Sequence, residues 1–276
     1  MIASDWGDWL PCAVKNAEPD GVSIWYLGCN GFILKGADGR TLFVDPYLGT
    51  GDPPRTVRMI PIPFDPEDIT EADALLVTHE HTDHVHGPSQ GPILEQTGAT
   101  LFAPDASMDV VQSEGWAETW DLASNIFESV SPGDTFEIGA FTIHVEAAYD
   151  PDAEEPVAYI IEHPAGTIFH GGDSKPTDAF EDLGARYDID LAIVAFGVVG
   201  NLFERSHTER KRTSWYCDEN QVVEIINALG ADRLLPSHWD MWKGMTADPK
   251  ALHHHTQSWP YPNRVDIVEI GDRIDL

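Results

Sequence analysis

The chain has few basic residues, few cysteines and no long apolar run. Its 276 residues include only 16 lysines and arginines against 47 aspartates and glutamates, which gives a formal net charge of -31. The acids are spread along the whole chain, and such an even negative surface repels the phosphates of nucleic acids. We therefore expect no nucleic acid partner.

The same charge imbalance affects stability. Like charges on a surface repel one another and destabilise the compact state unless salt screens them. Because lysine is so scarce, the composition favours a halophilic protein adapted to a salt-rich cytoplasm over an acidic mesophilic one. KCl is expected to raise the melting temperature of a salt-adapted protein, and the absence of such stabilisation would count against that alternative.

The three cysteines, Cys12, Cys29 and Cys217, are too few and too scattered for a disulfide framework or a cysteine-rich zinc site. We expect them to be small buried residues. No run approaches 18 apolar residues, and the first residues, MIASDWGDWLPCAV, lack the basic region and continuous apolar core of a secretory signal. The sequence predicts a cytoplasmic protein with no membrane partner.

Short apolar runs rich in β-branched and aromatic residues predict strands. They lie at residues 23–27, 31–36, 41–46, 74–79, 136–139, 141–148, 156–163, 167–173, 190–197, 232–238 and 265–270. Helical patterns lie at about 88–97, 105–114, 175–183 and 218–229. Two strand-rich halves with intervening helices predict a layered α/β fold with two facing sheets. We find no low-complexity linker and no repeat, so residues 1–276 are expected to form a single domain.

The segment THEHTDHVHG, residues 78–87, carries the densest chemistry of the chain. His79, His81, Asp83 and His84 follow the pattern H-x-H-x-D-H directly after the apolar run ALLV. Residues two apart in an extended segment point the same way, so His79 and His81 can converge on one ion. Imidazole and carboxylate suit Zn, Mn or Fe, which predicts a metal centre. His86 lies outside the pattern and is expected to be a loop residue or to support the ligands.

H-x-H-x-D-H after a strand resembles the metal-binding signature of the metallo-β-lactamase superfamily, which implies a four-layer αββα sandwich. The resemblance also implies ligands on later strands: Asp173 in FHGGDS, placed to bridge two ions, and His238 in LLPSHWD. Where the family usually has a histidine, VEAAYD offers Asp150, which would make that site richer in oxygen and favour Mn. The alternative for Asp150 is a turn-capping role before Pro151.

A longer series of blocks is similar to the UlaG-like branch, the L-ascorbate-6-phosphate lactonase-like enzymes. DWGDWL, WYLGCNGFIL, VDPYLGTGD, THEHTDH, HGGDS and SHWDMWKGMTADP match in order over about residues 5–250. The resemblance implies a lactonase acting on a sugar or phosphosugar lactone, and a homo-oligomer. The chain is shorter than the branch between GTGD and THEH and at the C-terminal end, where loops shape the pocket.

One or two divalent ions, Mn or Zn, would lower the pKa of a bound water so that a metal-bound hydroxide attacks the lactone carbonyl. Asp83 either orients this water and relays its proton or is simply a ligand. The same scaffold could serve a phosphodiesterase or ribonuclease. A flavodiiron-type oxidoreductase is disfavoured because His81 stands where that group has Glu and no flavin domain is appended. An inactive scaffold is disfavoured because every expected ligand class is retained, apart from the change of histidine to Asp150.

The densest group of basic residues follows the apolar run at 190–197. Arg205, Arg210, Lys211 and Arg212 could bind an anionic substrate from a loop over the metal, or pair with nearby acids such as Glu204, Glu209 and Asp218. Four aromatic residues could wall the pocket or pack in the core or a subunit contact: Trp239, Trp242, Trp215 and Tyr216. Asp45 could support the ligands or form a turn before Pro46. The histidine triplet at 253–255 is expected to form a polar helix face.

Overall fold

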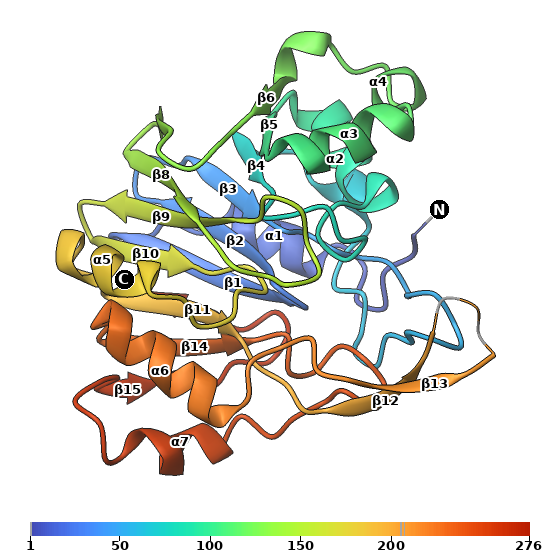
Figure 1. The fold of residues 1–276 in the computed structure, drawn as a ribbon. Coiled ribbons are helices and arrows are strands. Elements are labelled where there is room, and N and C mark those ends of the chain that lie inside the picture. The colour runs from blue at the N-terminus through green and yellow to red at the C-terminus, as the bar shows by residue number, and fades with distance from the viewer. Residues whose placement is uncertain (1, 205, 207) are drawn as a thin grey trace.

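The computed structural model describes residues 2–204, 206 and 208–276, and two seven-stranded sheets face each other at its centre (Figure 1). In order across the first sheet, the strands are β16 (Arg273–Asp275), β1 (Val22–Gly28), β2 (Gly31–Gly36), β3 (Thr41–Val44), β4 (Ala74–Leu76), β5 (Thr100–Ala103) and β6 (Phe127–Ser129). The second sheet contains β15 (Arg264–Val265), β14 (Arg233–Ser237), β11 (Leu191–Ala195), β10 (Gly166–His170), β9 (Val157–His163), β8 (Phe141–Ala147) and β7 (Thr135–Ile138).

Side-chain alternation along the strands builds the core. Ile24 and Tyr26 of β1 point into the space between the sheets, while Trp25 and Leu27 point to the outer face. Successive strand residues point to opposite faces, so a strand that is apolar throughout is buried on both sides. Tyr159 of β9 joins the inner cluster from the opposite sheet. Each large apolar side chain buried in this way contributes roughly 1.5–3 kcal/mol.

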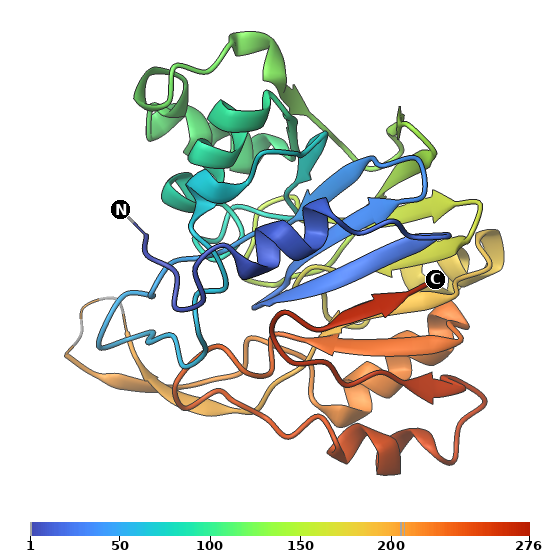
Figure 2. The same ribbon diagram turned by 180° about the vertical axis from the view of Figure 1, so that it is seen from behind.

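Helices cover both outer faces and complete four layers. The first sheet is covered by α1 (Trp9–Lys15), α2 (Gly87–Thr97), α3 (Asp105–Ser113) and α4 (Trp116–Thr119), and the second by α5 (Ala179–Arg186), α6 (Glu219–Leu229) and α7 (Ala251–Thr256). Figure 2 shows α1 lying across the outer face of the first sheet, with β16 beside β1. Two short 3-10 turns, η1 (Pro66–Asp68) and η2 (Ser124–Ile126), lie in connections. The predicted αββα sandwich is confirmed.

The helix predicted at 218–229 is the best-capped helix among the described residues. Asp218 accepts hydrogen bonds from the backbone N–H groups of Asn220 and Gln221, and the side chain of Gln221 accepts one from the backbone of Asp218. Gly230 ends α6 in the left-handed conformation, with φ 63°. This reciprocal box satisfies N–H groups that lack partners within the helix. The boundaries of α6 therefore follow from local sequence.

Some elements differ from the sequence-based expectation. The basic segment forms strand β13 (Arg210–Thr213), paired antiparallel with β12 (Gly200–Phe203), rather than a loop. The expected strand at 265–270 is reduced to β15, and β5, β6, β12 and β16 are not among the predicted strands. Strands of three or four residues are too short for a clear alternating pattern. Among the described residues, no helix is long and apolar enough to cross a membrane.

Candidate metal centre

Ligand-type side chains meet at one end of the two sheets, each just beyond a strand. Residues 78–84 follow β4, Asp150 follows β8, Asp173 follows β10 and His238 follows β14. These connections lie far apart in the sequence, and the packing of the two sheets brings them together. The convergence expected from the sequence is thus observed at one edge of the sandwich.

A first group consists of His79, His81, Asp150 and Asp173, whose ligand atoms lie within 4.8 Å of one another. His79 Nε2 is 3.0 Å from His81 Nδ1 and 3.7 Å from Asp150 Oδ2. His81 Nδ1 is 3.5 Å from the same Asp150 oxygen. Asp150 is 8% exposed and faces these imidazoles, although its Oδ1 also accepts a turn hydrogen bond from the backbone N–H of Asp152. Both readings of Asp150 therefore have a structural counterpart.

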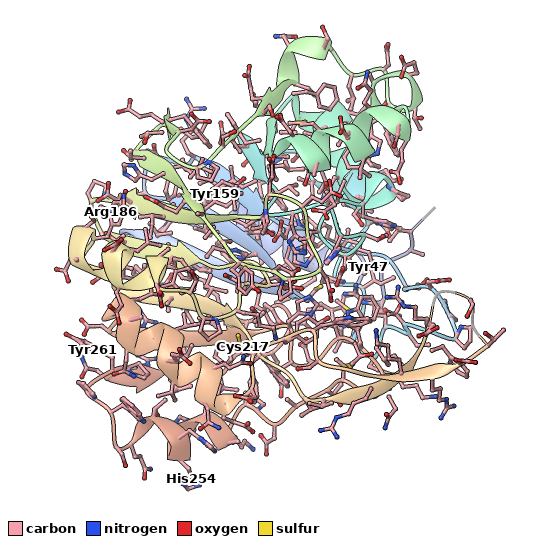
Figure 3. All side chains as sticks on the ribbon, viewed as in Figure 1. Tyr47, Tyr159, Arg186, Cys217, His254 and Tyr261 are labelled. Atoms are coloured by element: carbon pink, nitrogen blue, oxygen red, sulfur yellow. The ribbon has the colours of Figure 1, made fainter. Side chains whose placement is uncertain are left out.

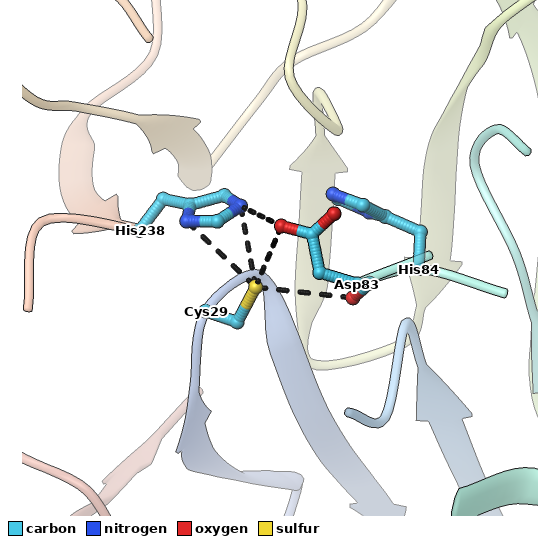
Figure 4. A group of neighbouring side chains, drawn as sticks. All are labelled: Cys29, Asp83, His84 and His238. Carbon is cyan, nitrogen blue, oxygen red and sulfur yellow. Dashed lines mark hydrogen bonds and ion pairs between the residues drawn. The ribbon is translucent and has the colours of Figure 1, made fainter. Parts of the chain in front are cut away.

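A second group consists of Cys29, Asp83, His84 and His238 (Figure 4). His238 Nε2 lies 3.3 Å from Asp83 Oδ2. Cys29 Sγ lies 3.2 Å from His238 Nε2 and 3.6 Å from Asp83 Oδ2. Cys29, His84 and His238 are buried. Cys29 belongs to the turn between β1 and β2, so a third connection contributes to this second group.

Asp173 lies between the two groups. Its Oδ2 is 3.5 Å from His84 Nε2, and its Oδ1 is 3.6 Å from His238 Nε2. Asn30 Nδ2 donates a hydrogen bond of 3.3 Å to Asp173 Oδ1. The Asn30 side chain is held in turn by the Ser237 hydroxyl, which donates to Asn30 Oδ1. One carboxylate thus faces side chains of both groups, which is the position expected of a bridging ligand.

A buried layer behind the ligands fixes the orientation of two imidazoles. Asp45 accepts hydrogen bonds from His84 Nδ1 at 2.8 Å, from the Thr78 hydroxyl at 2.7 Å and from the Thr78 backbone N–H at 2.9 Å. The Thr78 hydroxyl in turn lies 3.0 Å from His79 Nδ1. With Nδ1 engaged in this way, the Nε2 atoms of His79 and His84 face the centre. Such hydrogen bonds set the tautomer of metal-binding histidines.

His84 provides the test of whether the residues fit a metal. Its Nε2 is buried and has no hydrogen-bond partner among the described residues. A buried polar atom without a partner is costly, and here it points at a carboxylate in the midst of imidazole and carboxylate donors. The donor set and this orphaned nitrogen both fit a divalent cation.

The pKa shifts of His79, Asp150 and Asp83 agree with that assignment. Burial, with the nearby His84, lowers the pKa of His79 well below its ordinary value, so the ring is neutral and can offer a lone pair. Burial and the neighbouring Asp173 raise the pKa of Asp150 to about 6. Burial alone would raise the pKa of Asp83, but the adjacent imidazoles, His238 foremost, lower it overall. Three clustered carboxyl groups, those of Asp83, Asp150 and Asp173, form a site that a cation would stabilise.

The centre opens into a cavity of about 1260 Å³. Its floor includes His81, Asp83, Asp150 and Asp173, and its walls include Lys211 and Arg212 from β13. Aromatic residues complete the walls: Tyr47, Phe203, Trp215, Tyr216 and Trp242. Tyr216 stacks on the His238 ring at 4.0 Å between centroids, and Trp242 Nε1 donates a hydrogen bond of 3.3 Å to Asp83 Oδ2.

Two residues predicted to bind substrate lie elsewhere. Trp239 does not line this cavity and packs instead against the core beneath α5, α6 and α7. Arg210 is exposed, stacks over the Phe203 ring at 4.7 Å and is also absent from the cavity wall. Of the basic residues of β13, Lys211 and Arg212 line the cavity and Arg210 does not, a difference that the sequence does not specify. Arg205 lies outside the described residues.

Other candidates are resolved by their positions. His86 lines the cavity and contacts Tyr47, with Nδ1 2.6 Å from Ser89 Oγ. The triplet at 253–255 is exposed on α7, and Figure 3 shows His254 at the lower edge of the molecule, away from Tyr47. Among the cysteines, Cys217 is buried as expected, whereas Cys12 is exposed, because α1 presents it away from the sheet. Cys29 is also buried as expected: it packs in an apolar cluster with Tyr216 and Trp242, and it belongs to the second ligand group as well.

Several site residues were missed because their contacts are long-range. Cys29 and Asn30 follow an apolar strand and are separated from the histidine cluster by about fifty residues. No spacing rule connects such positions. The only available signal was that both occupy a turn directly after a buried strand, the same kind of position as the predicted ligands.

Comparison with known proteins defines the class of this protein. Residues 40–239 match the family model described as the beta-lactamase superfamily domain, and the chain belongs to this superfamily. Together with the two groups of metal-binding side chains, this membership makes it a metal-dependent hydrolase.

Among curated relatives, the chain is 24% identical over 293 aligned positions to the probable L-ascorbate-6-phosphate lactonase UlaG of Escherichia fergusonii, covering 90% of this chain and 78% of the relative. The solved structure of Igni18, a metallo hydrolase from Ignicoccus hospitalis, superposes with a TM-score of 0.69 at 18% identity, covering 92% and 98% of the two chains. An isothiocyanate hydrolase from Delia radicum gut bacteria also has a TM-score of 0.69, at 14% identity and with 92% and 99% coverage. At these identities the solved structures show a shared fold.

Proposed function

We propose that this chain is a metal-dependent lactonase that opens a sugar or phosphosugar lactone in the cytoplasm. The observation that carries the proposal is the composition of the cavity. Ligand-type acids and imidazoles form its floor, while cationic and aromatic side chains form its walls. The similarity to L-ascorbate-6-phosphate lactonases over 90% of the chain supports a lactone substrate.

The residues of the two groups are proposed to hold one or two divalent ions, Mn or Zn. His79, His81 and Asp150 would hold one position, and Asp83, His84 and His238 the other. Asp173, which faces both groups, would bridge them. A divalent ion bound there supplies a Lewis acid for the carbonyl oxygen and a water of lowered pKa.

Asp83 is the proposed catalytic residue. Its carboxyl lines the open cavity, and its pKa is held low by the neighbouring imidazoles although burial opposes this. An ionised carboxylate in contact with the cavity can accept a hydrogen bond from the attacking water and so orient it, or relay its proton to the leaving ring oxygen. The low pKa of Asp83 favours the orienting role. The N–H of Trp242 and the ring of His238 hold Asp83 Oδ2 in place.

The wall formed by Lys211 and Arg212 is proposed to recognise an anionic group of the substrate. Both belong to β13 and line the cavity. In the described part of the chain, neither forms an ion pair with Glu204, Glu209 or Asp218. A guanidinium binds a phosphate or carboxylate in bidentate fashion, and the indoles of Trp215 and Trp242 offer apolar faces for a sugar ring. Partners are thus small anionic molecules and, by family resemblance, further copies of the chain.

Acid release in high KCl, with Mn or Zn added to metal-free protein, tests this function. The substrates are L-ascorbate 6-phosphate, unphosphorylated pentono- and hexonolactones, and bis(p-nitrophenyl) phosphate. We expect metal-dependent lactone opening, lowered about 100-fold or more in Asp83→Asn. Asp109→Asn, on the exposed face of α3, is the matched control and should retain full activity. Turnover of the phosphodiester alone would contradict the lactonase proposal and favour a phosphodiesterase.

A further inference from the structure

Cys29 stands apart from the other two cysteines because its thiol points into the second ligand group (Figure 4). Its Sγ approaches both His238 Nε2, at 3.2 Å, and Asp83 Oδ2, at 3.6 Å, and those two atoms are 3.3 Å apart. Around a tetrahedral zinc with bonds of about 2.3 Å to sulfur and about 2.0–2.1 Å to nitrogen or oxygen, ligand atoms stand roughly 3.4–3.6 Å apart. The observed triangle has nearly those edges.

A thiol that serves only as a hydrogen-bond donor needs a single acceptor. The Cys29 sulfur has one proton, yet His238 and Asp83 present four N or O atoms within 3.8 Å of it. His84, in the same group, carries the buried Nε2 atom without a partner. A cation between these side chains would satisfy the orphaned nitrogen and the sulfur together.

The backbone also holds the cysteine in an uncommon conformation. Cys29 has φ 60° and His238 has φ 64°, in the left-handed region that costs a non-glycine residue about 1–2 kcal/mol. The two turns are joined directly, because the backbone N–H of His238 donates a 2.7 Å hydrogen bond to the Cys29 carbonyl. The fold therefore fixes the sulfur beside the imidazole.

We propose that Cys29 is a sulfur ligand of the second metal position, which it shares with Asp83, His84 and His238. The inference rests on the proposed metal centre and adds a selectivity to it. A thiolate favours thiophilic ions such as Zn over Mn, whereas the group around Asp150 offers only nitrogen and oxygen. The two positions are thus chemically unequal, and the proton of the thiol leaves to solvent as the ion binds.

Cobalt(II) titration of the metal-free full chain tests the inference by absorption. In the wild type we expect visible ligand-field bands together with a near-ultraviolet sulfur-to-cobalt charge-transfer band. Cys29→Ser should keep the ligand-field bands and lose the charge-transfer band. Cys217→Ser, which alters the other buried thiol, should keep both. Circular dichroism and melting curves of Cys29→Ser and Cys29→Ala show whether each variant is folded.

Affinity gives a second readout that a merely structural cysteine would not produce. Cys29→Ser should weaken Cd²⁺ binding about tenfold or more and Mn²⁺ binding much less. Two results would overturn the assignment of Cys29 as a ligand while leaving the metal centre intact. One is a wild type with ligand-field bands but no charge-transfer band, and the other is a charge-transfer band that persists in folded Cys29→Ser. Failure of the wild type to bind cobalt would overturn the centre itself and the inference with it.

Discussion

At the scale of single residues, Asp45 controls the centre without facing the cavity. It accepts three hydrogen bonds from His84 and Thr78 and is fully buried. In Asp45→Asn, the amide nitrogen cannot accept a hydrogen bond, so one donor loses its partner and the His84 ring loses its fixed orientation. We expect metal affinity to fall about 10–100-fold, as measured by calorimetric titration.

The substitution Asp109→Asn, at an exposed position, is the control because it also removes one negative charge. Equal metal affinity in both variants would mean that Asp45 has only a structural role in its turn. That was the alternative left open by the sequence, because Asp45 precedes Pro46. The structure gives Asp45 a φ of 43°, which agrees with a turn.

At the scale of elements, the turn after β10 positions the bridging acid. Gly172 precedes Asp173 with φ 55°, and a Cβ at this position would lie 2.9 Å from Thr78 Oγ1 and 3.0 Å from Thr78 Cβ. Gly172→Ala therefore combines backbone strain with displacement of the hydroxyl that binds Asp45. We expect a loss of more than about 2 kcal/mol in the free energy of unfolding and weaker metal binding.

Gly98→Ala separates the two contributions. Gly98 ends α2 with φ 68°, and an added Cβ there meets no atom within 4 Å. It should cost only the backbone strain of about 1–2 kcal/mol and leave metal affinity unchanged. Denaturant unfolding and cobalt titration of both variants provide the comparison, and equal losses would exclude the contact with Thr78 as the cause.

The hairpin of β12 and β13 is the element expected to select the substrate. Removing the cation in Arg212→Ala or Lys211→Ala eliminates a charge-assisted hydrogen bond worth about 1.5–3 kcal/mol. We expect KM for a phosphorylated lactone to rise about tenfold or more, with little change for its unphosphorylated counterpart. Arg210→Ala removes the same charge outside the cavity and should leave KM nearly unchanged. Equal effects of all three variants would indicate general electrostatic attraction instead.

At the scale of the whole molecule, the net charge of -31 predicts stabilisation by salt. Screening shortens the Debye length from about 10 Å at 0.1 M to about 3 Å at 1 M, which weakens repulsion among the distributed acids. The melting temperature should therefore rise between low and molar KCl. Sucrose at matched osmolality is the uncharged control. A melting temperature independent of KCl would count against salt adaptation.

Metal removal should also destabilise the whole molecule, because the centre joins connections from both sheets. A ligand at 100 times its Kd stabilises the folded state by about 2.7 kcal/mol. We expect chelation at fixed KCl to lower the melting temperature and Mn or Zn to restore it. The shift should shrink in Asp173→Asn, which alters the acid facing both groups. An unchanged shift in that variant would argue against a bridging carboxylate.

The sequence by itself predicted the two-sheet architecture and, through the family resemblance, most of the side chains that meet at the candidate metal centre. Apolar runs such as residues 23–27 and the helical pattern at 218–229 are local signals, and H-x-H-x-D-H places four candidate ligands within six residues. Only the tertiary structure decided the remainder: that Cys29 joins Asp83, that Asp45 holds His84, and that Trp242 rather than Trp239 reaches the cavity. These contacts depend on sheet packing and on hairpin register, which arise from the burial of many distant side chains and leave no spacing rule in the chain.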